Sequence, residues 1–112
     1  MPSQIESIDQ QRIDQLKLLM GDKFLGFTDL FVSQLNQRID ILELAIGEDK
    51  ADSILQAHSI KGSAANMGAS KLVSIVKQLE TMLEKDDIEG AANLLLEIKD
   101  ELDIVKDVLI YK

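Results

Sequence analysis

The residues with the clearest chemical potential lie together in one short stretch, where His58 is followed by Lys61 and Gly62. His58 is the only histidine among 112 residues, and a neutral imidazole is a nucleophile. Residues three and four positions apart lie side by side on a helix, so a helix here would place Lys61 and Gly62 beside the ring. Lysine can neutralise a phosphoryl oxygen. Glycine costs roughly 0.5–1 kcal/mol relative to alanine within a helix, and clearance for a bulky group on the imidazole would explain it.

A fourth candidate, Glu80, comes from the next segment of the chain. His58 lies ten residues before Gly68, and Glu80 lies twelve residues after it. If Gly68 joins two antiparallel helices, these separations are roughly 15 and 18 Å at 1.5 Å per residue, so the two side chains would lie level. The carboxylate could then accept the Nδ1 proton of His58, which leaves the Nε2 lone pair directed outward.

The surface expected around His58 is small or apolar and carries almost no charge. On a helical projection, the face centred on His58 includes Ala51, Ile54, Lys61, Gly62 and Ala65. On so acidic a protein a solvated face would normally carry charges, so this strip favours a docking site. We therefore predict Ala51, Ile54 and Ala65 as partner-binding residues. The alternative is that a flanking helix covers the strip.

The elements that must position these residues are helices, because apolar residues recur at intervals of three and four and no strand pattern is present. We predict helices from residue 8 or 9 to 20, from about 23 to 46, from about 49 to 67, from about 70 and from about 87. Gly21, Gly47 and Gly68 are expected to end helices, and Ser70 to cap one. The predicted apolar stripes are, in order, Ile13, Leu16, Leu19 and Met20; Phe24, Phe27, Phe31, Leu35, Ile39, Leu42 and Ile46; Ala57, Ile60, Ala64 and Met67; Leu72, Ile75, Val76, Leu79, Met82 and Leu83; and Ile88, Ala91, Leu95, Ile98, Leu102, Val105 and Leu109.

Short connections make successive helices antiparallel neighbours, and four long amphipathic helices close around one core as an up-and-down bundle. The predicted fold is therefore all-α, a four-helix bundle with an additional short N-terminal helix across one end. We expect one monomeric domain over residues 1–112, with residues 1–7 as a flexible terminus. A coiled-coil dimer is the alternative, but the breaks at the three glycines and at Asp86-Asp87 favour the bundle.

Composition narrows the possible functions. The formal net charge is −8, with 20 acidic and 12 basic residues, which disfavours binding to nucleic acids and to anionic membranes. One histidine and no cysteine argue against a metal site. The sequence has neither a secretory signal nor a membrane span, so we expect a cytoplasmic protein. The acid pairs Asp86-Asp87 and Asp100-Glu101 are expected at a helix start and on an exposed helix face, where capping and solvation would explain them.

The spacing His58-x-x-Lys61-Gly62, followed by Gly68-Ala69 and Leu79-Glu80, resembles the signature of the histidine-containing phosphotransfer (HPt) domains of multistep two-component phosphorelays. The resemblance covers the whole chain in helix number and order, whereas the specific motif lies within residues 57–80. It implies that His58 is phosphorylated, that Lys61 stabilises the phosphate, that Gly62 provides clearance and that Glu80 orients the imidazole. Ile60 stands where leucine is more common in the family.

The resemblance also implies how the protein works. It would be a phosphocarrier, not an enzyme with its own ATP site, and would accept a phosphoryl group from one receiver-domain aspartate and pass it to another. The expected partners are response-regulator receiver domains, including those of hybrid sensor kinases. They would supply Mg²⁺, and the chain itself would need no cofactor. The alternative is a non-phosphorylated adaptor that binds a partner helix through Ile54, His58, Gly62 and Ala65.

Overall fold

The computed structural model of the protein describes residues 6–111, which form helices and no strand. In chain order these are α1 (Gln10–Met20), the 3-10 helix η1 (Gly21–Lys23), α2 (Phe24–Ala45), α3 (Lys50–Met67), α4 (Ser70–Glu84) and α5 (Ile88–Tyr111). The all-α prediction is confirmed, and the helices begin and end close to the predicted residues. The flexible terminus predicted for residues 1–7 lies for the most part outside the described range.

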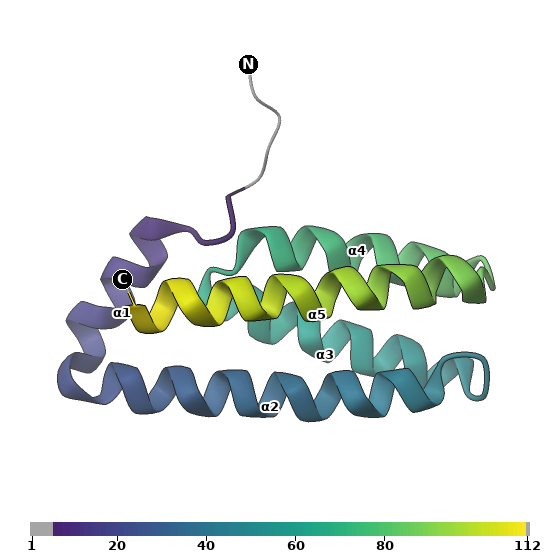
Figure 1. The fold of residues 1–112 in the computed structure, drawn as a ribbon, viewed down its shortest axis with the longest axis horizontal. Helices are drawn as coiled ribbons and strands as arrows, with labels where there is room; N and C mark the ends of the chain where they lie inside the picture. Colours follow the sequence, from purple (N-terminus) through teal and green to yellow (C-terminus); the bar gives the residue numbers. More distant parts are fainter. Residues whose placement is uncertain (1–5, 112) are drawn as a thin grey trace, which may run out of the picture.

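The four long helices run side by side along the molecule, and α1 crosses the end where α3 turns into α4 (Figure 1). Their directions alternate, which confirms the antiparallel up-and-down bundle. The core draws on all five α-helices and includes Ile13 and Leu16 of α1; Leu35, Ile39 and Leu42 of α2; Ile60, Ala64 and Met67 of α3; Leu72, Val76 and Leu79 of α4; and Ile98, Leu102 and Val105 of α5. None of these helices is long and apolar enough to cross a membrane, as far as residues 6–111 are concerned.

The helix that carries His58 has well-defined ends. Asp49 caps its start by accepting a hydrogen bond of 3.0 Å from the backbone N–H of Asp52. Gly68 ends it in the left-handed conformation, with φ of 84°, as predicted. The prediction that Ser70 caps the next helix is wrong. Ala69 occupies the cap position without a side-chain hydrogen bond, and Ser70 is already the first helical residue, because the tight turn at Gly68 leaves no room for a longer connection.

Two residues of the predicted apolar stripes are exposed. The side chain of Leu19 lies outside the core, since α1 crosses the end of the bundle and turns only a narrow stripe, Ile13 and Leu16, towards it. Ile88 is also exposed, because it is the first residue of α5 and lies at the opposite end of the bundle, where no further turn of helix covers it. Helical periodicity encodes neither the way α1 crosses the bundle nor the residue at which α5 begins.

Glu101 is buried, with 2 % of its surface exposed, so its prediction on a solvated face is wrong. It lies three residues after Ile98 and four before Val105, and both of these side chains face the core. Its Oε1 is 4.0 Å from the Nζ of Lys71, and its buried Oε2 has no hydrogen-bond partner. The carboxylate therefore occupies a core position between α5 and the start of α4.

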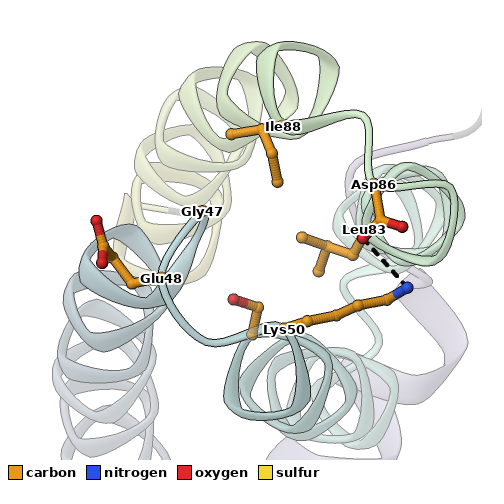
Figure 2. Close-up of a pocket in the computed structure, with 7 residues that line it drawn as sticks. Gly47, Glu48, Lys50, Leu83, Asp86 and Ile88 are labelled. Carbon is orange, nitrogen blue, oxygen red and sulfur yellow. Dashed lines mark ion pairs between the residues drawn. The ribbon is translucent and has the colours of Figure 1, made fainter.

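At the end of the bundle opposite α1, an opening of about 250 Å³ lies between the two helix connections. In Figure 2, Lys50 at the start of α3 reaches across to Asp86 after α4, while Leu83 and Ile88 line the opening with apolar surface. The Lys50 Nζ lies 3.2 Å from the Asp86 carboxylate and donates to the backbone oxygen of Glu84 at 3.3 Å. One lysine thus joins the start of α3 to the end of α4.

Candidate functional site

The hairpin of α3 and α4 brings the four predicted site residues together. His58 lies on the outward side of α3 with 71 % of its side chain exposed, and Glu80 faces it from α4 with 19 % exposed. Lys61 lies one turn after His58 and its side chain is 25 % exposed. The arithmetic of the hairpin, which placed Glu80 level with His58, therefore agrees with the observed arrangement.

Glu80 contacts both neighbours, but not equally. Its Oε1 lies 2.7 Å from the Nζ of Lys61, which is a close ion pair. Its Oε2 lies 3.7 Å from the Nδ1 of His58, which is too long for a hydrogen bond. The carboxylate is therefore occupied by Lys61 in this state. The role of Glu80 in orienting the imidazole stays a prediction.

Gly62 is exposed beside His58, and a Cβ atom added there would meet nothing within 4 Å. Its backbone is helical, so neither a special conformation nor close packing of the described chain requires a glycine. Close packing against another helix of residues 6–111 therefore does not explain this glycine. What glycine provides here is free space above α3, next to the imidazole.

The strip around His58 is open to solvent. Ala51 and Ala65 are exposed and Ile54 is half-buried, so no helix within residues 6–111 covers the predicted docking residues. This surface also contains an exposed leucine that was not predicted from the sequence. Leu55, three residues before His58, is 60 % exposed, and its helical spacing from the histidine was the signal that could have found it.

A shallow groove of about 540 Å³ runs along α4 beside the histidine. It is lined by Lys61, Lys77, Glu80, Thr81, Glu84 and Lys85. Lys77 was not predicted to belong to the site, although it precedes Glu80 by one helical turn. Within residues 6–111 it makes no ion pair, unlike Lys61. In the same range, no cluster of three or more histidine, cysteine or carboxylate side chains could hold a metal ion.

Comparison with known proteins identifies the family to which this group of site residues belongs. The family model described as the Hpt domain matches residues 26–108, which include α3, α4 and all four site residues. The chain belongs to the Hpt domain family. It is therefore a histidine phosphotransfer protein of the kind that works in phosphorelays, and the resemblance seen in the motif of residues 57–80 is confirmed.

Solved structures support the same assignment. Histidine-containing phosphotransfer protein B from Pseudomonas aeruginosa is 27% identical, with a TM-score of 0.85 over 95% of this chain and 93% of that one. A candidate histidine-containing phosphotransfer protein from rice shares the fold (18% identity, TM-score 0.83, 92% of this chain and 78% of that one). A histidine-containing phosphotransfer protein from maize shares it as well (20% identity, TM-score 0.81, 90% and 78%). A search of curated proteins finds no significant match.

The Hpt fold explains why the reactive group is so accessible. The imidazole of this Hpt domain stands on a helix surface, not in a cleft, because α3 turns Ala57 and Ile60 into the core and the opposite side outward. A second macromolecule can therefore bring its own reactive group up to His58. The core residues on the inner side of α3 keep the helix, and with it the histidine, in a fixed place.

Proposed function

We propose that the protein carries a phosphoryl group on the Nε2 of His58 between aspartates of receiver domains. The observation that carries this proposal is the exposed imidazole with Gly62 beside it and the Lys61–Glu80 pair at its flank, in a chain of the Hpt family. Nδ1 is the ring nitrogen on the side of Glu80. Nε2 is therefore the nitrogen that we assign to phosphorus.

The transfer needs few functional groups from this protein. The Nε2 lone pair attacks the phosphorus of an aspartyl phosphate, the N–P bond forms, and the P–O bond breaks with its electron pair returning to the aspartate. A second receiver takes the group by the reverse sequence. Because phosphoryl transfer depends mainly on position and charge stabilisation, a fixed imidazole with a lysine beside it is sufficient here.

The remaining requirements fall to the partner. We propose that response-regulator receiver domains, including those of hybrid sensor kinases, supply the acidic pocket and the Mg²⁺. The chain then acts as a carrier without an ATP site or cofactor of its own, in keeping with a sequence that has no glycine-rich phosphate loop. The exposed strip with Ala51, Ile54 and Ala65 is the surface on which we place the receiver.

The test is transfer from phosphorylated receivers of the source organism in the presence of Mg²⁺. We expect a phosphate that is labile in acid and stable in base, located at His58 by peptide mapping. His58→Gln should abolish the labelling and leave the helicity unchanged. A protein that binds receivers but never acquires phosphate from any of them would instead be the non-phosphorylated adaptor.

A further inference from the structure

We propose that Glu80 exchanges ion-pair partners when His58 is phosphorylated. In the free protein Glu80 holds Lys61. In the phosphorylated protein Lys61 pairs with the phosphoryl oxygens, and Glu80 accepts a hydrogen bond from the Nδ1 of His58. The inference rests on the proposed function, since it describes the same site before and after it is loaded.

The geometry places one carboxylate between two groups that can each use it. Oε1 is engaged by Lys61 at 2.7 Å, while Oε2 is 3.7 Å from Nδ1 of His58. A shift of about an ångström would bring Oε2 to the usual length of an N–H···O hydrogen bond. Glu80 is four-fifths buried on α4, and the two groups within 4 Å of its carboxylate that can pair with it, Lys61 and His58, both lie on α3.

The charges change in a way that favours the exchange. The imidazole that attacks phosphorus must carry a free lone pair, and towards such a ring the ammonium of Lys61 is the stronger partner for a carboxylate. As the N–P bond forms, Nδ1 keeps its proton and the ring acquires positive charge, so its N–H becomes a charged donor towards Glu80. At the same moment the phosphoryl group brings about two negative charges close to Lys61. Both new pairs join opposite charges, whereas the old arrangement would leave the phosphate without its cation.

Lys61 is the cation suited to this movement. It lies one helical turn from His58, so its four-carbon stem can swing from Glu80 to a group on the imidazole without displacing the backbone. Lys77 lines the same groove, but it lies on α4 and has no ion-pair partner within residues 6–111. It provides a matched lysine that belongs to the groove and not to the exchange.

The experiment follows the ¹⁵N signals of the His58 ring and the Lys61 ammonium by NMR, with phosphoramidate as a donor that needs no receiver. Before phosphorylation, the Lys61 signal of the Glu80→Gln variant should differ from that of the wild type. Phosphorylation should move the Lys61 signal of the wild type. In the phosphorylated state, the Lys61 signals of the wild type and of the Glu80→Gln variant should coincide. The Nδ1 proton should then appear as a hydrogen-bonded, slowly exchanging signal.

Two variants separate the exchange from mere proximity. Lys61→Gln should produce the hydrogen-bonded Nδ1 signal already in the unphosphorylated protein, because Glu80 is released. Lys77→Gln should leave both signals as in the wild type. A Lys61 signal that stays at its resting position after phosphorylation would refute the exchange, as would a Lys61→Gln ring indistinguishable from the wild type.

The same samples distinguish this inference from the proposed function. If phosphoramidate modifies His58 but no receiver does, the carrier role fails and the exchange is still read from the spectra. If receivers load His58 and Lys61 remains on Glu80, the carrier role stands and the exchange fails. If neither donor modifies His58, both are overturned.

Discussion

Gly62 has a helical backbone, and the space above it is empty. Glycine therefore lowers the stability of the helix, and no contact within the described chain requires it. We expect Gly62→Ala to raise the free energy of unfolding by about 0.5–1 kcal/mol, the usual advantage of alanine in a helix. Urea denaturation measures this. Gly26, a helical glycine of α2 that also has nothing within 4 Å of its Cβ position, is the control and should respond in the same way to alanine. A loss of stability in Gly62→Ala alone would show a packing role that we have overlooked.

A longer side chain at the same position should act on transfer and not on folding. Gly62→Gln would extend over the imidazole, and we expect the rate of transfer from a phosphorylated receiver to fall by roughly 100-fold, as happens when reacting groups are held apart. Single-turnover transfer assays measure the rate. Gly26→Gln should transfer normally. A Gly62→Gln protein with unchanged helicity and an unchanged rate would remove clearance as the reason for this glycine.

Among the connecting elements, the turn between α3 and α4 depends on Gly68. Its φ of 84° is costly for other residues, and an added Cβ would lie 3.0 Å from the Cβ and Cγ of Arg12. Its carbonyl oxygen also accepts a hydrogen bond of 2.7 Å from the N–H of Asp9, at the start of α1. One residue thus ends α3 and seats the N-terminal helix.

We therefore expect Gly68→Ala to lower the free energy of unfolding by about 1–2 kcal/mol, the cost of a left-handed residue with a Cβ, and by more if Arg12 cannot give way. Denaturant unfolding gives the value. Gly47→Ala is the comparison, because Gly47 has nearly the same φ, 86°, and its added Cβ would meet only the Ile88 side chain at 3.5 Å, an ordinary van der Waals contact. Equal losses in the two variants would mean that the contact with Arg12 adds nothing, and an unaffected Gly68→Ala would contradict the assignment of strain.

For the molecule as a whole, the weak point of the core is Glu101. Its carboxylate is buried and, within residues 6–111, one of its oxygens has no partner, while the other lies 4.0 Å from the half-exposed Lys71. Buried polar groups without partners cost stability, and apolar replacements of buried ionic groups are often neutral or stabilising. The phosphotransfer site is formed by α3 and by Glu80 of α4, whereas Glu101 lies on α5 and faces Lys71 at the start of α4.

We expect Glu101→Leu to raise the free energy of unfolding by about 1 kcal/mol or more and to leave the rate of transfer unchanged. Thermal or urea unfolding, together with the receiver assay, tests both parts. The exposed neighbour Asp100 offers the control, since Asp100→Leu should change stability by no more than about 0.5 kcal/mol. A destabilised Glu101→Leu would show that the carboxylate contributes to the native packing after all.

Much of this protein is determined locally and can be predicted from the sequence. The stripe from Phe24 to Leu42 encodes a helix and its inner face, and Gly68 encodes the end of another, because helical periodicity and left-handed glycine turns act over only a few residues. The site followed from the same local rules. His58, Lys61 and Gly62 share one helix, and one hairpin length brings Glu80 opposite.

Tertiary structure decided which neighbour each side chain meets. Glu80 pairs with Lys61 and not with the imidazole, because two groups on α3 compete for one carboxylate and only their distances settle the competition. Leu19 is exposed, against the periodicity of α1, because α1 crosses the end of the bundle and turns only Ile13 and Leu16 towards it, and Glu101 is buried where α5 packs beside the start of α4. These outcomes depend on the placement of helices far apart in the chain, and spacing within one helix carries no information about it.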